Sequence, residues 1–113
     1  MGANMNNDTT DAPKTSMRMQ DLRLTVELLG EAVKQERGAR ERIAERYGIR
    51  KSVITNRVDR METFFGVMLF TGPQRKTPTA AGRVMARYGP RLIQEFEEFA
   101  GMLQDASKPD EVA

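Results

Sequence analysis

Apolar residues recur every three or four positions in the first half of the chain, which is the period of a helix with one buried face. The first such stretch predicts a helix over residues 21–37, ended by Gly38, because glycine readily adopts the left-handed conformation that closes a helix. Its core positions are Leu22, Val26 or Leu29, and Val33. A short second helix is predicted over residues 39–47, before Gly48. Its apolar stripe consists of Ile43, Ala44 and Tyr47.

The third predicted helix, over residues 51–65, follows a short turn after Gly48 and carries the narrowest apolar stripe. Four apolar side chains lie within about 60° of one another on a helical wheel, so they predict one buried edge. They are Ile54, Val58, Met61 and Phe65. The outward positions are polar: Ser52, Thr55, Asn56, Asp59 and Arg60. Two short helices joined by a glycine-containing turn are typical of a helix-turn-helix.

The pattern changes after Gly66. A run of four apolar residues, 67–70, is short enough for a strand, and residues 71–78 contain one glycine, two prolines and two adjacent cations. Such a segment predicts a β-hairpin, or wing, that places its cations at the minor groove or backbone of DNA, and an ordinary surface hairpin is the alternative. Thr79 has the side chain of a helix N-cap and predicts a last helix that runs to about Gln104.

The last helix has more apolar positions than a small three-helix core can cover. They are Val84, Met85, Tyr88, Leu92, Ile93, Phe96, Phe99, Ala100 and Leu103. Pro90 predicts a kink or two abutting helices, since proline lacks an amide hydrogen and clashes with the preceding turn. We expect the same helix of a second subunit to cover the stripe, through Tyr88, Leu92, Ile93, Phe96, Phe99 and Leu103. Packing back onto the first helix is the alternative.

Charge is unevenly distributed along the chain, although the net charge is only +2. Residues 37–91 hold 13 Lys or Arg against 4 Asp or Glu, whereas residues 1–36 hold 4 against 6 and residues 92–113 hold 1 against 6. A basic middle between acidic ends is typical of a protein that presents one face to a polyanion, usually nucleic acid. The charge pattern therefore favours a DNA-binding protein.

Several other classes of function are disfavoured by composition. The chain has no Cys and no His, which removes disulfides, most zinc and copper sites, thiol catalysis and the usual imidazole base. We therefore expect no enzyme, no catalytic or metal site and no cofactor. The apolar runs are too short for a membrane span or an export signal, so we expect a cytoplasmic location and no membrane partner. Residues 1–16 and 107–113 are polar and are expected to form a disordered arm and a flexible tail.

The outward face of the third helix has the chemistry to read bases in a major groove, where Asn pairs with adenine, Arg with guanine and Thr with the thymine methyl group. The expected base-contacting residues are Lys51, Ser52, Thr55, Asn56 and Arg60. Asp59 is expected to act as a filter that tolerates only a base donor such as cytosine N4. Contacts to the DNA backbone are expected from Arg42, Arg50, Arg57, Arg75, Lys76 and Thr79. An ordinary solvated helix face is the alternative.

Residues 38–82 resemble the N-terminal winged helix-turn-helix domain of LysR-type transcriptional regulators. In that family the recognition helix ends in a Leu-Glu pair, matched here by residues 61–62. A glycine four residues later, matched by Gly66, precedes a Leu-Phe pair, matched by residues 69–70. The family's wing closes on a Leu-Thr-x-x-Gly motif, matched by residues 78–82 with Pro in place of Leu.

The resemblance implies a mainly α fold: a winged helix-turn-helix with a three-helix core and a short β wing over residues 17–82, then a long C-terminal dimerisation helix over residues 83–106. It also implies a homodimer that binds double-stranded DNA and regulates transcription. Family members continue into an effector-binding domain that this sequence does not contain, so no small-molecule effector is expected. Two alternatives stay open: a DNA-bending architectural or recombination accessory factor, and a winged-helix protein-interaction module.

Overall fold

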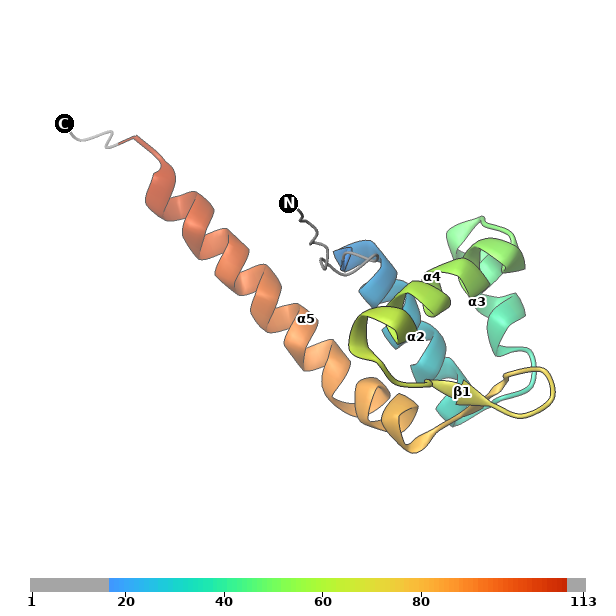
Figure 1. The fold of residues 1–113 in the computed structure, drawn as a ribbon. Helices are drawn as coiled ribbons and strands as arrows, with labels where there is room; N and C mark the ends of the chain where they lie inside the picture. The colour runs from blue at the N-terminus through green and yellow to red at the C-terminus, as the bar shows by residue number, and fades with distance from the viewer. Residues whose placement is uncertain (1–16, 110–113) are drawn as a thin grey trace, which may run out of the picture.

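The computed structural model describes residues 17–109, a mainly helical part of the chain with one small antiparallel sheet. Its elements are α2 (Met19–Lys34), α3 (Ala39–Tyr47), α4 (Lys51–Phe65), β1 (Phe70–Thr71), β2 (Thr77–Pro78) and α5 (Ala80–Ser107). The first three helices and the hairpin form a rounded body, from which the second half of α5 projects (Figure 1). The predicted arm, residues 1–16, and the end of the predicted tail, residues 110–113, lie outside the described residues.

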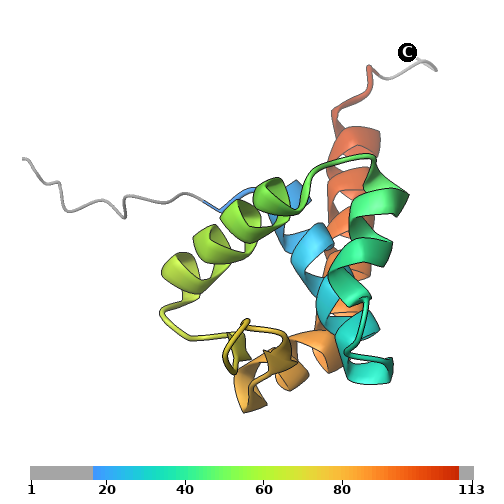
Figure 2. The ribbon, with the colours of Figure 1, turned by 90° about the vertical axis from the view of Figure 1, so that its right-hand side faces the viewer.

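The core is built around α2. Figure 2 shows α2 between α4 and α5. Helix α2 contributes nearly half of the buried apolar side chains. The buried apolar residues are Leu22, Leu24, Val26, Leu28, Leu29, Ala32, Ala39, Ile43, Ile54, Val58, Met61, Leu69 and Phe70. Burial of such side chains supplies the main driving force for folding, at roughly 25 cal/mol per Å² of apolar area.

The predicted boundaries of α3 and α4 are confirmed, but α2 ends earlier than predicted. It stops at Lys34 rather than about Arg37, because Gln35 has an extended backbone conformation. Gly38 does not close α2; it has a left-handed backbone and precedes α3 as its N-cap. The connection between the two helices is held by Arg42, whose guanidinium donates to the carbonyl oxygens of Gln35 (2.7 Å) and Arg37 (2.9 Å).

Three side chains predicted to be buried are exposed. Val33 lies one turn beyond Leu29, which the start of α5 covers, and about half of the Val33 surface is exposed. The Tyr47 hydroxyl donates to Glu27 at the edge of the body. Phe65 is the last residue of α4 and lies past the core, edge-on to Phe64 with ring centroids 5.0 Å apart.

The hairpin is shorter than the predicted strand. Only two residue pairs join β1 and β2, Phe70 with Pro78 and Thr71 with Thr77. The residues 67 and 68 of the predicted strand are exposed and precede it, while Leu69 and Phe70 enter the core. Residues 72–76, called the hairpin loop below, begin with a turn in which the amide of Arg75 donates to the carbonyl of Gly72 at 3.0 Å.

Helix α5 begins as predicted, because the Thr79 side chain caps it by accepting a hydrogen bond from the amide of Gly82 at 3.0 Å. It is one continuous helix through Pro90, so the alternative of two abutting helices is wrong, and it ends at Ser107 rather than about Gln104. A proline removes one backbone hydrogen bond, and the turns on both sides keep the helix intact here.

Glycines bring the first half of α5 close to the body. A Cβ atom on Gly82 would lie less than 3.0 Å from the carbonyl oxygen of Leu69, and one on Gly89 would lie 2.6 Å from Cγ2 of Val26. Met85, Ala86 and Ile93 pack against the core on the same side of the helix. This face of α5 therefore packs onto α2 within one chain, which is the alternative that the sequence left open.

Candidate nucleic-acid interface

The outward face of α4 is polar and accessible. Lys51, Ser52, Thr55 and Asn56, four of the five predicted base-contacting residues, are exposed on the side away from the core. Arg50 precedes the helix and is exposed, and no side chain caps the first turn. The unpaired amide hydrogens of a first turn carry partial positive charge, which adds to that of Arg50 and Lys51. The N-terminal end of α4 is therefore suited to contact with an anion.

The fifth predicted base-contacting residue, Arg60, is held by a buried carboxylate. Asp21 of α2 is fully buried, and its Oδ2 accepts from Nε of Arg60 at 2.9 Å. This hydrogen bond raises the pKa of Arg60 above its ordinary value. Nε of Arg57, a predicted backbone contact, lies 3.6 Å from Oδ1 of the same carboxylate. Both arginines thus fix one flank of α4 to α2.

Asp21 was not singled out from the sequence, but a signal for it exists. At helical spacing it shares a face with Thr25, Leu28 and Ala32, all of which are buried. An acidic residue on an apolar face requires a cationic partner, since an unpaired buried charge is strongly unfavourable. The sequence does not show that the partners come from a helix more than thirty residues away.

The other flank of α4 is fixed to the hairpin loop by Arg75. Its Nη1 donates to Oδ1 of Asp59 at 3.0 Å and its Nη2 to Oε1 of Glu62. The hydrogen bonds that Arg75 donates to Asp59 and Glu62 raise the pKa of Arg75. The Arg75 guanidinium, predicted to contact the DNA backbone, is directed toward α4, and the Asp59 carboxylate, predicted to act as a specificity filter, is already paired with a cation.

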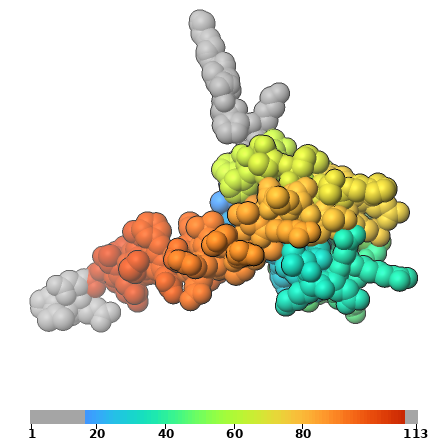
Figure 3. Space-filling view, turned by 90° about the horizontal axis from the view of Figure 1, so that it is seen from below, coloured from blue at the N-terminus to red at the C-terminus, as the bar shows by residue number. Residues whose placement is uncertain are grey.

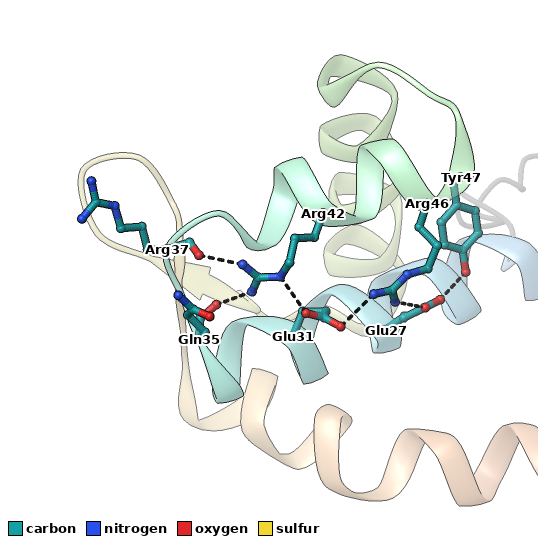
Figure 4. Close-up of polar contacts among 7 residues, drawn as sticks. All are labelled: Glu27, Glu31, Gln35, Arg37, Arg42, Arg46 and Tyr47. Carbon is teal, nitrogen blue, oxygen red and sulfur yellow. Dashed lines mark hydrogen bonds and ion pairs between the residues drawn. The ribbon is translucent and has the colours of Figure 1, made fainter.

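Arg42, another predicted backbone contact, belongs to an ion-pair network between α2 and α3 (Figure 4). Its Nε donates to Oε1 of Glu31 at 2.8 Å, while Arg46 bridges Glu31 and Glu27 and the Tyr47 hydroxyl donates to Glu27. Hydrogen bonds from Arg42 and Arg46 hold the pKa of Glu31 below its ordinary value. Burial and the neighbouring Glu27 raise the pKa of Tyr47 to about 12.

The remaining predicted backbone contacts divide into one structural residue and two accessible cations. Thr79 is half-buried and, besides capping α5, donates its hydroxyl to the carbonyl of Met68 at 2.6 Å. Arg50 and Lys76 are exposed, and within residues 17–109 neither forms an ion pair. Lys51 pairs with Glu41 at 2.9 Å, and both side chains are more than half exposed. An exposed pair of this kind is weak and easily exchanged for another anion.

The accessible cations lie on one side of the molecule. The connection between α3 and α4 and the hairpin loop both lie at the right of Figure 1, away from the projecting end of α5. Arg50 lies in this connection, Lys51 begins α4 directly after it, and Lys76 lies in the hairpin loop. The polar face of α4 lies between them along the chain.

A second surface is formed by the apolar stripe on α5. Five of the six predicted dimerisation residues are roughly half exposed: Tyr88, Leu92, Phe96, Phe99 and Leu103. The sixth, Ile93, is half-buried and packs against the core. Val84 and Met102 extend the exposed stripe. Seen from below, the second half of α5 extends beyond the body, and no other described segment covers it in this view (Figure 3).

None of the four described helices is long and apolar enough to cross a membrane. Residues 17–109 also contain no cluster of three or more acidic side chains arranged to hold a metal ion. In comparisons with known proteins, no family model, no curated protein and no solved structure gave a match to this chain.

Proposed function

We propose that this chain is a sequence-specific transcriptional regulator that binds double-stranded DNA as a homodimer. In this proposal α3 and α4 form a helix-turn-helix and the hairpin loop is its wing, as in the LysR-type domains that the sequence resembles. The observation that carries the proposal is the exposed polar face of α4, with Ser52, Thr55 and Asn56, next to the accessible cations Arg50 and Lys51. A helix of this chemistry fits a major groove.

The predicted DNA-contacting residues fall into two groups: those that remain free to contact DNA and those with partners inside the protein. Lys51, Ser52, Thr55 and Asn56 contact base edges, while Arg50 and Lys76 contact the DNA backbone. A second group of predicted DNA contacts is engaged in internal hydrogen bonds or ion pairs instead: Arg42, Arg57, Arg60, Arg75 and Thr79. This division predicts a smaller number of released counterions than the net charge of the basic segment suggests.

The homodimer forms through the exposed stripe of α5, and the charges of the helix favour an antiparallel arrangement. Arg83, Arg87 and Arg91 lie in its first half. Its second half is acidic, with Glu95, Glu97, Glu98 and Asp105. Antiparallel pairing brings the basic half of each helix next to the acidic half of the other, whereas parallel pairing brings like charges together. The two α4 helices are then related by a two-fold axis and match an inverted repeat.

The test is selection of bound sequences from a random duplex pool at about 0.15 M salt, with light scattering of the recovered complex. The expected result is an inverted repeat bound by two chains. Recovery of no motif, with binding that disappears as salt rises, would point instead to an architectural factor. Absence of any DNA binding would leave the exposed α5 stripe as the surface of a protein-interaction module.

Asn56→Ala tests the reading face directly. An adenine paired with Asn is worth about 1–3 kcal/mol of discrimination, so we expect the variant to lose affinity for the selected site by that amount and to keep its affinity for scrambled DNA. Gln94→Ala, which removes an exposed amide from the polar face of α5, is the matched control. If Asn56→Ala binds the selected and the scrambled sites as wild type does, the assignment of α4 as the reading helix is wrong.

A further inference from the structure

We propose that Arg75 is a positioning residue for DNA binding: its two ion pairs set the hairpin loop against α4, so that Lys76 reaches the DNA backbone while α4 occupies the groove. The inference rests on the proposed function and assigns to Arg75 a role other than direct phosphate contact. Its basis is the direction of the Arg75 side chain, which reaches Asp59 and Glu62 on α4.

The hairpin has little of its own to hold it in position. It contains two residue pairs, and two-stranded hairpins are marginally stable in water even when longer. Its position therefore depends on contacts with the rest of the body. Glu62 of α4, which is largely buried, provides such contacts. Its Oε2 accepts hydrogen bonds from the amides of Leu69 (2.7 Å) and Phe70 (3.4 Å), and its Oε1 accepts one from Arg75. One carboxylate thus holds both the entry to β1 and the loop.

The backbone conformation of Arg75 also indicates that contacts with the body hold the hairpin loop in position. Arg75 has a φ of 51° and is the one non-glycine residue with positive φ in the described part of the chain. This left-handed conformation is unfavourable for a residue with a side chain, so surrounding contacts must maintain it. They come from both ends of the residue: the guanidinium pairs with two carboxylates, and the carbonyl accepts from Nη2 of Arg40 at 2.9 Å.

Arg40 is itself fixed, since its guanidinium carbon lies 4.9 Å from the centre of the Phe70 ring. The loop is therefore tied to α3 by Arg40 and to α4 by Asp59 and Glu62. Lys76 follows directly and is exposed, without an ion pair within residues 17–109. A lysine held at a fixed distance from the reading helix contacts phosphate at a smaller loss of entropy than one on a free loop.

The test is a double-mutant cycle between Arg75→Gln and Lys76→Ala, measured as affinity for the selected duplex over a range of salt concentrations. Lys76→Ala is expected to weaken binding several-fold and to lower the slope of log affinity against log salt by about 1. Arg75→Gln should weaken binding similarly, and the double variant should bind no worse than Arg75→Gln alone. If Arg75 contacts phosphate itself, the two losses multiply and the slope falls by about 2; that result overturns the proposal.

Arg75→Lys distinguishes the effect of the positive charge from the effect of the hydrogen-bond geometry. It also takes the place of Arg75→Gln if that variant fails to fold. Lysine keeps the charge but cannot donate to two carboxylates through a planar fork, so it should bind DNA as weakly as Arg75→Gln. Wild-type affinity of Arg75→Lys contradicts the positioning role. Arg23→Gln is the matched control, because it also removes one arginine from an ion pair, on the side of α2 that faces α5. It should leave both affinity and slope unchanged.

Hydrogen exchange of the DNA-free protein distinguishes failure of this inference from failure of the proposed function. In Arg75→Gln, the amides of Leu69 and Phe70 should exchange at least about tenfold faster, while amides in the middle of α2 keep their protection. Unchanged exchange at the hairpin overturns the inference whether or not DNA binds. A wild-type protein that binds no duplex overturns the proposed function, and exchange still shows whether Arg75 positions the hairpin.

Discussion

Asp21 of α2 is the buried carboxylate that fixes one flank of α4 to the body. It is a fully buried carboxylate whose partners, Arg57 and Arg60, lie on the same helix. Removing both arginines would leave a buried charge without a partner, which typically costs about 3–5 kcal/mol. We therefore expect Arg57→Ala combined with Arg60→Ala to lower the free energy of unfolding by that amount in urea titrations.

A control for this prediction is Lys51→Ala, which breaks an exposed ion pair with Glu41. Exposed pairs contribute about 0–1 kcal/mol, so the free energy of unfolding should change little. Restoring neutrality by adding Asp21→Asn to the double variant should recover part of the loss, because the buried charge is removed as well. Equal stability of the double variant and wild type would show that Asp21 does not depend on the two arginines.

Glycines in α5 give a second residue-scale prediction, with a control in the same helix. Gly82→Ala places a methyl group against the Leu69 carbonyl, and overpacking of this kind costs about 1–3 kcal/mol. Gly101→Ala meets nothing within 4 Å, and alanine should stabilise the helix by about 0.5–1 kcal/mol. Thermal unfolding of the two variants should therefore shift in opposite directions, and two shifts of the same sign would contradict the close contact at Gly82.

Tyr47 makes stability sensitive to alkaline pH. Its pKa is raised from 10.0 in the unfolded chain to about 12 in the folded one, mainly by burial and then by Glu27. The neutral phenol therefore contributes stability that is fully present below pH 10 and is lost as the pH rises toward about 12. Tyr47→Phe should unfold with a weaker pH dependence in this window, measured by denaturant titration, since phenylalanine has no proton to lose.

At the scale of the elements, the sequence predicted those features that local chemistry determines. The apolar stripe of Ile54, Val58 and Met61 placed α4 correctly, and Thr79 marked the start of α5, because a helical period and a cap depend on neighbouring residues. The end of α2 and the two-residue strands were not predicted. Both depend on side chains from elsewhere, Arg42 for the first and Glu62 for the second.

In the candidate interface, too, features set by neighbouring residues were predicted and those set by distant side chains were not. Exposure of Ser52, Thr55 and Asn56 follows from their place opposite the apolar stripe, and the sequence predicted it. The partners of Arg60 and Arg75 could not be predicted, since a sequence shows a cation but not the carboxylate it meets 39 or 13 residues away. Basic residues around a helix are therefore of two kinds, and only the structure separates cations that support the helix from cations that are accessible to a partner.

At the scale of the whole molecule, α5 has one face packed against the body and one exposed face. Gly82 and Gly89 bring one face against the body, and the exposed stripe from Val84 to Leu103 forms the other. In an antiparallel pair, the register that superposes this stripe on itself places Tyr88 opposite the partner subunit's Phe99. It also brings Arg83 close to the partner subunit's Asp105. A parallel pair would instead place each residue opposite its own copy.

Introduced cysteines can distinguish the two arrangements, because the chain has none of its own. An oxidised mixture of Tyr88→Cys and Phe99→Cys chains should form a covalent heterodimer if the helices are antiparallel, since facing core positions bring Cα atoms within the roughly 4.4–6.8 Å that a disulfide spans. Each variant alone should stay uncrosslinked, whereas a parallel pair would crosslink each variant with itself.

Adding Leu92→Asp should abolish the crosslink by placing a charge in the stripe, while Val67→Asp, an exposed apolar position outside it, should not. Crosslinking that survives Leu92→Asp would mean that the stripe is not what holds two chains together.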